Sequence, residues 1–273
     1  MKITVMMPAY NEERDLPGLL ERTREALGPW ADYEVLIVDD GSRDRTAEIV
    51  IAAQDRMPVR LIRHPQNMGL GAAIRTGLKA ASLADGVVVT LDADNSQGPE
   101  LIREMIAKIE AGADVVIASR FQPGAQEVGV PPHRKFLSHL SSGAIRVLAP
   151  YPGARDYTCG FRAYRVEVLR QLIGRYGDAF VRENGFSCML ELLLNLRRIG
   201  ATVAEVPLVL RYDLKQGASK MRILRTMWRY VVTITRGWLP LAPVWPDTVR
   251  RDLPAGGDPT QAGSLRPPST ERH

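Results

Sequence analysis

Short runs of almost uniformly apolar residues alternate with helix-like stretches through the first part of the chain. The runs are Ile3–Met7, Val35–Val38, Val59–Ile62, Val87–Leu91 and Val115–Ala118. Runs of this length and composition are typical of strands that are buried on both faces of a parallel sheet. The helix-like stretches between them are Glu13–Leu27, Asp44–Gln54, Gly71–Leu83 and Pro99–Glu110. This alternation predicts an α/β fold with a doubly wound, mainly parallel sheet flanked by helices.

The pattern changes after Phe121. We expect a loop over Gln122–Pro132, and a late strand over Thr202–Leu210 that precedes a final helix. Further helices are predicted over Arg134–Leu148, Val166–Ile173 and Phe186–Arg198. The last stretch, Pro254–His273, is rich in Pro, Gly, Ser and Thr, a composition typical of a disordered tail. The predicted organisation is therefore one α/β domain over 1–215, a loop and amphipathic helix over 216–240, and a disordered tail over 241–273.

Acidic and turn-forming residues follow three of the predicted strands. Pro8–Glu12 follows the first strand, Asp39–Ser42 the second, and Asp92–Asp94 the fourth. In doubly wound sheets ligands bind beyond the carboxyl ends of the strands, so we expect these segments to line one site. Asp92 and Asp94 are two residues apart, which on an extended backbone places both carboxylates on one side. Such a pair suits Mg²⁺ or Mn²⁺, although an isolated Asp-x-Asp is also common as a solvated turn or helix cap.

Four segments of this region resemble, in order and spacing, the family 2 glycosyltransferases of the GT-A fold: PAYNEE, DDGSRDRT, NMGLGAAIRTGL and LDADNSQGPELI. Five later segments are similar to the dolichol-phosphate mannose synthase branch: IASRF, PPHRKFLSHLSS, DYTCGFRAYRVEVL, GFSCMLELL and GASKM. The resemblance covers Ile3 to Met221. It implies a metal-dependent, inverting hexosyltransferase that moves a hexose from a sugar nucleotide to a polyprenyl or dolichyl phosphate. In the mannose synthase branch the hexose is mannose and the donor is GDP-mannose.

The resemblance also assigns residues to the donor site. It implies that the base and ribose are held by Pro8, Tyr10, Glu12, Asp39 and Asp40. It implies that Asp92 and Asp94 bind Mg²⁺ or Mn²⁺. Asn67 and Gly69 belong to the NMGLGAA segment, which begins a predicted helix. The backbone N–H groups at the start of this helix would help to bind a phosphate.

On the acceptor side the resemblance implies a phosphate-binding group made of Arg120, Arg134 and Ser138. Arginine suits this role because its guanidinium can grip phosphate oxygens as a fork. Ser219 and Lys220 fall in the loop that closes over the nucleotide in this family. A lipid phosphate is already anionic and needs no strong base. A sugar hydroxyl acceptor would need one, and Glu191 is the candidate.

Three positions depart from the family pattern. Ser96, followed by Gln97, stands where a metal-binding Gln is usual, so the third metal ligand is open. Leu214 replaces the Arg that usually begins the closing loop, and Met189 replaces a common Gln. These changes leave the donor sugar, the nucleotide and the acceptor undecided.

The final predicted helix is amphipathic. At 100° per residue, four arginines fall within an arc of about 60°, namely Arg222, Arg225, Arg229 and Arg236. The opposite face gathers Met221, Leu224, Trp228, Val231 and Trp238. Such a helix can lie at an anionic membrane surface, or it can pack its apolar face on the core while its arginines face water. Both interpretations stay open.

The charge and the cysteine content limit which partners and which cellular compartment we expect for this protein. The net charge of +5 and the pI near 9.3 favour anionic partners. The sequence holds no recognisable nucleic-acid-reading motif, so we expect no nucleic-acid partner. Two cysteines cannot form a disulfide framework, and neither a signal peptide nor a membrane-spanning stretch is evident. These features predict a cytoplasmic protein, peripheral at the cytoplasmic face of the membrane.

Other classes remain as alternatives. A dinucleotide-dependent dehydrogenase is disfavoured because no Gly-x-Gly-x-x-Gly turn follows the first strand. A glycosyltransferase for a soluble sugar or secondary-metabolite acceptor remains open. So does a non-catalytic lipid- or nucleotide-binding module on the same fold.

Overall fold

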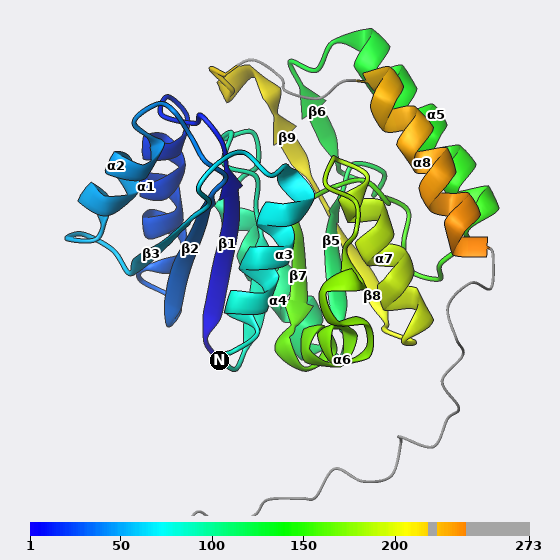
Figure 1. Ribbon diagram of the computed structural model, residues 1–273, viewed down its shortest axis with the longest axis horizontal. Coiled ribbons are helices and arrows are strands. Elements are labelled where there is room, and N and C mark those ends of the chain that lie inside the picture. The colour runs from blue at the N-terminus through cyan, green and yellow to red at the C-terminus, as the bar shows by residue number, and fades with distance from the viewer. Residues whose placement is uncertain (218–222, 239–273) are drawn as a thin grey trace, which may run out of the picture. The chain divides into compact units, whose positions relative to one another are not determined.

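The computed structural model describes residues 1–217 and 223–238, and its centre is a seven-stranded sheet (Figure 1). The strand order is β3-β2-β1-β4-β7-β5-β8. The strands are β1 (Ile3–Ala9), β2 (Tyr33–Asp39), β3 (Val59–Arg63), β4 (Val87–Thr90), β5 (Val115–Ser119), β7 (Arg162–Arg165) and β8 (Val203–Pro207). Adjacent strands run parallel except that β7 runs antiparallel to both of its neighbours. The predicted mainly parallel α/β fold is confirmed.

The register of the sheet brings the three acidic segments to one edge. Ala9 at the end of β1 pairs with Asp39 at the end of β2. Met6 in β1 pairs with Thr90, the last residue of β4. Pro8 and Asp92 each lie two residues beyond the Met6–Thr90 pair, so they reach the same level of the sheet. The segments that follow β1, β2 and β4 therefore meet at this edge.

Helices cover both faces of the sheet (Figure 1). One face carries α1 (Leu16–Leu27), α2 (Thr46–Ala53) and α4 (Ile102–Glu110), the last preceded by the 3₁₀ turn η1 (Pro99–Leu101). The other face carries α3 (Leu70–Ala81), α6 (Val166–Tyr176) and α7 (Cys188–Arg198), and the 3₁₀ turn η2 (Gly177–Phe180) follows α6.

The start of α1 differs from the prediction. The helix begins at Leu16 rather than Glu13, with Pro17 in its first turn. Proline is common in the first turn of a helix, because the N–H groups there have no partner within the helix and the missing one costs nothing. Asp15, immediately before the helix, is buried, and its carboxylate is used elsewhere in the fold.

Strand β7 was missing from the sequence-based expectation. It is short and begins and ends with arginine, so it lacks the apolar run that predicted the other strands. Arg162 is nevertheless fully buried. Its guanidinium donates hydrogen bonds to the backbone oxygens of Met189, at 2.8 Å, and Tyr157, at 2.9 Å. These partners make the buried charge tolerable, because buried polar groups need hydrogen bonds.

The predicted strand over 202–210 and the predicted loop over 122–132 are both wrong in part. The chain leaves the main sheet at the end of β8 and continues as β9 (Val209–Arg211). This strand pairs in parallel with β6 (Gln126–Val128), and the 3₁₀ turn η3 (Tyr212–Leu214) follows it. Pro207 ends β8, as expected of a residue that cannot donate to a ladder.

Helix α5 (Pro132–Leu148) and helix α8 (Ile223–Trp238) pack against each other, and α8 also contacts α7 (Figure 1). The inward face of α8 is formed by Thr226, Tyr230, Thr233 and Ile234, which are buried. Trp228 and Val231, predicted on an inward or lipid-facing apolar side, are 67% and 53% exposed. Neither open interpretation of the arginine side included a protein partner, yet the Arg229 guanidinium bonds the buried carboxylate of Glu183 while 42% of the arginine side chain stays exposed.

The remaining expectations for this end of the chain fall outside the described residues. Met221, Arg222 and the tail over 241–273 are not described, and neither are the side chains of Leu224, Arg225, Arg236 and Trp238. Within the described part of the chain, no helix is long and apolar enough to cross a membrane.

Candidate active site

A cavity of about 960 Å³ opens at the carboxyl edge of the sheet, where the strand-end segments meet. Residues that sequence had assigned to the site form much of its wall: Pro8, Tyr10, Glu12, Asp40, Asn67, Gly69, Asp92, Asp94 and Arg120. They come from stretches of chain far apart in sequence. The sheet therefore gathers nine of the predicted residues around one space.

The Asp92 and Asp94 carboxylates are supported by neighbouring polar groups. The Gln97 amide donates to Asp92 Oδ2 at 2.8 Å, and its oxygen accepts from the Asp92 N–H at 3.1 Å. Ser96 Oγ donates to Asp94 Oδ1 at 2.5 Å. Ser96 and Gln97 thus orient the two carboxylates. Burial, with the nearby charge of Asp94, raises the pKa of Asp92 to about 7.

A cation already lies at this carboxylate pair. Lys215, just after η3, places its Nζ 2.5 Å from Asp94 Oδ2. Two carboxylates that attract a cation suit a divalent metal, which Asp92 and Asp94 would hold. Among the described residues, no cluster of three or more His, Cys, Asp or Glu is arranged to hold a metal alone.

Asp39 and Asp40 shape the strand-end loops. Asp40 Oδ1 accepts from the Met68 N–H at 2.9 Å, and Oδ2 accepts from the Gly69 N–H at 2.8 Å. Asp40 also bonds the His64 ring at 2.7 Å. Asp39 is fully buried, and its carboxylate caps the turn by accepting from the Ser42 N–H. Asp40 lines the cavity, whereas the fully buried Asp39 is not among its lining residues.

Three backbone donors at the NMGLGAA helix opening have partners within the protein, and its expected phosphate-binding role stays a prediction. The Met68 and Gly69 N–H groups bond Asp40, and the Gly71 N–H donates to the backbone oxygen of Asn184 at 3.0 Å. These donors are occupied within the protein. Gly69 has φ +94°, and a Cβ at this position would lie 2.5 Å from the backbone oxygen of Asn184. The position therefore requires glycine because another stretch of backbone passes close to it.

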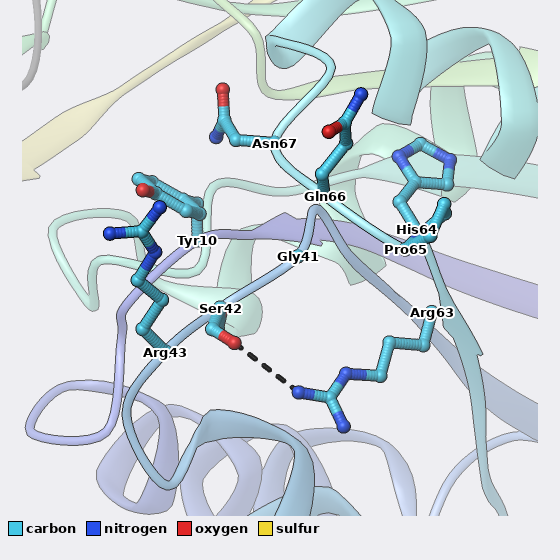
Figure 2. A pocket seen from close by; sticks show the side chains of 9 residues that line it. All are labelled: Tyr10, Gly41, Ser42, Arg43, Arg63, His64, Pro65, Gln66 and Asn67. Carbon is cyan, nitrogen blue, oxygen red and sulfur yellow. Dashed lines mark hydrogen bonds between the residues drawn. The ribbon is translucent and has the colours of Figure 1, made fainter.

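A second pocket, of about 540 Å³, adjoins the first and shares Tyr10 and Asn67 with it (Figure 2). Its lining comes from the ends of β1, β2 and β3: Tyr10, Gly41, Ser42, Arg43, Arg63, His64, Pro65, Gln66 and Asn67. Arg63 donates to the Ser42 backbone oxygen at 3.2 Å, the bond drawn in Figure 2, and lies 3.2 Å from Asp39 Oδ2. Sequence reasoning missed Arg43, Arg63 and Gln66. Their position after strand ends was the signal that could have found them.

Arg120 lines the main cavity but does not present an open fork. Its Nε and Nη2 bond the two carboxylate oxygens of buried Asp156, each at 2.7 Å. Nη2 also donates to Thr158, and Nη1 donates to Ser138 at 2.8 Å. Four of its five N–H groups are thereby engaged. For Arg120 the expectation of a forked grip on phosphate is wrong, since its fork binds Asp156 and one Nη1 N–H remains for a ligand.

Ser138 holds Arg120 and is not among the residues that line the two pockets. Arg134 belongs to α5, but its side chain is outside the described residues. Ser219 and Lys220 are outside them entirely. The assignments of Arg134, Ser219 and Lys220 stay predictions.

The structure gives Glu191 a different use from that of a general base. Its Oε2 accepts from the backbone N–H groups of Arg182, at 2.7 Å, and Glu183, at 2.8 Å. Burial raises the pKa of Glu191, although those two backbone bonds oppose the rise. The side chain is absent from the cavity wall and holds the loop that lines it. The expectation of a base at this position is not supported by the geometry.

Sequence reasoning also missed three polar residues that line the cavity, namely Arg182, Asn184 and Arg229. Glu183, which is 2% exposed, receives both Arg229 bonds at 2.7 Å and the Ser187 hydroxyl at 2.8 Å. Helix α8 is thereby tied to the cavity wall. The amphipathic pattern of α8 gave no signal for this role.

Comparison with known proteins gives consistent results. Residues 4–173 match the family model described as glycosyl transferase family 2. A dolichol-phosphate mannosyltransferase of Pyrococcus furiosus is 33% identical over 240 residues, which cover 86% of this chain but only 63% of that protein. A polyprenol monophosphomannose synthase of Mycolicibacterium smegmatis is 33% identical over 222 residues, which cover 80% of each chain.

Among solved structures, glucosyl-3-phosphoglycerate synthase from Mycobacterium tuberculosis, in complex with Mn²⁺, UDP and phosphoglyceric acid, has a TM-score of 0.66. It is 21% identical in sequence, and the match covers 88% of this chain and 80% of that one. At this identity the likeness concerns the fold.

Proposed function

The chain belongs to glycosyl transferase family 2, and on that premise we propose that it transfers a hexose from a sugar nucleotide to a polyprenyl phosphate. The observation that carries the proposal is the composition of the main cavity. Asp92 and Asp94 line one space together with three arginines, Arg120, Arg182 and Arg229. The carboxylate pair suits a metal-bound diphosphate, and the arginines suit a second anion.

The donor would occupy both pockets. Its base and ribose would fill the pocket of Figure 2 beside Tyr10, and its diphosphate would extend towards Asp92 and Asp94. A bound Mg²⁺ or Mn²⁺ would neutralise the charge that develops on the leaving nucleoside diphosphate. The protein's own contribution is to orient the two carboxylates through Ser96 and Gln97.

We propose GDP-mannose as the donor. Two relatives carry mannose in their names. The base pocket contains Arg43 and Arg63, and guanine offers O6 and N7 as acceptors for a guanidinium.

The acceptor phosphate would approach the arginines that line the main cavity. Its oxygen is anionic near neutral pH, so the transfer requires alignment and charge stabilisation rather than a general base. Arg120, locked by Asp156 and Ser138, would direct its remaining Nη1 N–H to a phosphate oxygen. The positioning role of Glu191 agrees with a reaction that needs no base.

A lipid acceptor requires access to a membrane surface, and α5 and α8 supply a suitable face. Six apolar side chains described on these two helices are exposed, and we take them together as the α5–α8 apolar face: Phe136, Leu140, Val147, Leu148, Trp228 and Val231. Phe136 and Trp228 are each 67% exposed. Apolar side chains that include Trp are typical of helices that lie in the lipid headgroup region. We place this face on the cytoplasmic leaflet, where the two buried free cysteines, Cys159 and Cys188, would stay reduced.

Release of GDP from GDP-mannose tests the reaction. We expect release that requires both polyprenyl phosphate and Mg²⁺ or Mn²⁺. Asp94→Asn should lower the rate at least about a hundredfold, because a metal supplies several kcal/mol of charge stabilisation. Asp178→Asn, which changes a carboxylate paired with Lys79 on the surface, is the matched control. Release that is equally fast with soluble sugars and no lipid would contradict the proposed acceptor.

Flotation with vesicles of phosphatidylcholine and phosphatidylglycerol tests the membrane face. The Phe136→Ser and Trp228→Ser double variant should bind vesicles about tenfold less tightly, because two large apolar groups lose their burial. Leu83→Ser, at an 84% exposed site after α3, should bind like the parent. Unchanged vesicle binding together with loss of a dimer in gel filtration would assign the face to a second copy of the chain instead.

A further inference from the structure

The ion pair between Lys215 and Asp94 joins groups that are distant in sequence but share the wall of the main cavity. The Lys215 Nζ lies 2.5 Å from Asp94 Oδ2. Only 12% of the lysine side chain and 18% of the aspartate side chain are exposed. The contact therefore differs from most surface ion pairs, which solvent screens to little net value.

The other oxygen of Asp94 is already occupied. Oδ1 accepts from the Ser96 N–H, at 3.2 Å, and from Ser96 Oγ, at 2.5 Å. Oδ2 is thus the oxygen that an added cation would approach, and the lysine ammonium lies there. Ammonium and divalent metal ions both require this carboxylate charge, so the two compete for the same atom.

The backbone around Lys215 is anchored. Asp15, which is 2% exposed, accepts from the Gln216 N–H at 2.8 Å and from the Gly217 N–H at 2.9 Å. An added Cβ at Gly217 would lie 3.1 Å from Asp15 Oδ2, so the segment passes close to this carboxylate. Asp15 therefore fixes the segment that directs Lys215 towards Asp94.

From this geometry we propose that Lys215 is a competing cation that occupies the Asp94 side of the metal site until the sugar nucleotide arrives. The inference rests on the proposed function, since it requires the metal at Asp92 and Asp94. The lysine makes binding of the metal alone weak. When donor and metal bind together, the diphosphate supplies new negative charge for the displaced ammonium, so the exchange leaves no buried charge unpaired. Lys215 is a positioning residue that couples metal binding to donor binding.

Titration of Mn²⁺ into the full chain without nucleotide, followed by electron paramagnetic resonance, tests this exchange. Lys215→Met should bind Mn²⁺ at least about tenfold more tightly than the parent, because a competing charge at Asp94 is removed. Lys2→Met is the matched control: it removes the same charge from the opposite end of β1, where Lys2 pairs with Glu34. It should leave Mn²⁺ affinity unchanged and so exclude a general charge effect.

GDP gives the second arm of the experiment. With saturating GDP, the difference in Mn²⁺ affinity between the parent and Lys215→Met should shrink, because the lysine no longer competes. Without metal, GDP should bind Lys215→Met more weakly than the parent. Equal Mn²⁺ affinity in the parent and Lys215→Met, or an equal gain in Lys2→Met, would overturn the inference.

Asp94→Asn separates this result from failure of the proposed function. Loss of Mn²⁺ binding in Asp94→Asn, with no effect of Lys215→Met, rejects the competition and keeps the metal site. Mn²⁺ binding that survives Asp94→Asn, or no Mn²⁺ binding by any variant even with GDP, rejects both. Circular dichroism of each variant establishes that it is folded.

Discussion

Replacing Asp156 by Asn perturbs the group that holds Arg120 in the cavity wall. The Asp156 carboxylate is fully buried. It accepts from the backbone and side chain of Arg120 and from the backbone N–H groups of Thr158, at 3.2 Å, and Cys159, at 3.0 Å. Asn keeps the shape and one acceptor oxygen but removes the charge. Arg120, whose side chain is 15% exposed, is then left as an uncompensated cation.

The expected cost follows from that uncompensated charge. Breaking a buried ion pair from one side typically costs about 3–5 kcal/mol. Because 15% of the Arg120 side chain still contacts water, which partly solvates the unpaired charge, we expect the lower end of this range, about 3 kcal/mol. Because domains are stable by only about 5–15 kcal/mol, this loss is readily measured. Urea unfolding followed by circular dichroism should show a lower midpoint for Asp156→Asn, and donor turnover should fall because Arg120 loses its orientation.

A second substitution separates the charge from the shape. Adding Arg120→Met to Asp156→Asn removes the unpaired cation, so the double variant should recover part of the lost stability. Activity should stay low, since no guanidinium remains. A destabilisation below about 1 kcal/mol in Asp156→Asn, or no recovery in the double variant, would refute the reasoning.

The same pair predicts a pH dependence of stability. Burial alone would raise the pKa of Asp156, but the charge and hydrogen bonds of Arg120 outweigh it and lower the pKa. A carboxyl whose folded pKa is lowered stabilises the fold above its unfolded pKa, about 4. That contribution is lost as pH falls from there through the folded pKa. The parent should therefore lose stability in this acid range, and Asp156→Asn should lose less.

Three further predictions concern residues that line or support the two pockets. Glu191→Gln should keep most of the turnover, because the amide oxygen can still accept from the Arg182 and Glu183 N–H groups; a drop of a thousandfold in steady-state rate would restore Glu191 as a base. Gly71→Ala should lower donor affinity and stability, by about 1–3 kcal/mol in urea unfolding, because its Cβ would lie 1.7 Å from the Glu183 backbone oxygen. Gly174→Ala in α6, with nothing within 4 Å, should instead be neutral or stabilising, and equal effects at both positions would contradict this account. Arg63→Met should weaken GDP binding in calorimetry several-fold, and unchanged affinity would remove this arginine from the base pocket.

Much of the donor side could be predicted from local pattern. Apolar runs predicted the parallel strands, and the rule that ligands bind beyond their carboxyl ends placed Asp40, Asp92 and Asp94 at one edge. The prediction held there because each of these residues lies within four residues of the end of a strand. Pocket residues such as Arg43 and Arg63 obey the same rule, but their types did not mark them as site residues.

The second half of the site could not be predicted in this way, because its contacts join segments with no local signal. Arg120 and Asp156 are 36 residues apart, and Lys215 and Asp94 are 121 apart. Strand β7 enters between β4 and β5 against the order of the chain. Its buried arginine is compatible with a strand only because the backbone of neighbouring segments accepts its hydrogen bonds.

Helix α8 shows the division most clearly. Its periodicity in the sequence established that the helix has two unlike faces, since a 3.6-residue repeat separates them without any knowledge of neighbours. Only the tertiary structure decided which face turns inward. The buried Glu183 carboxylate requires a cation, and Arg229 supplies it, while Trp228 is left on the surface. Local pattern determines what a segment can present, whereas the choice between its faces depends on the charge and shape of whatever it meets.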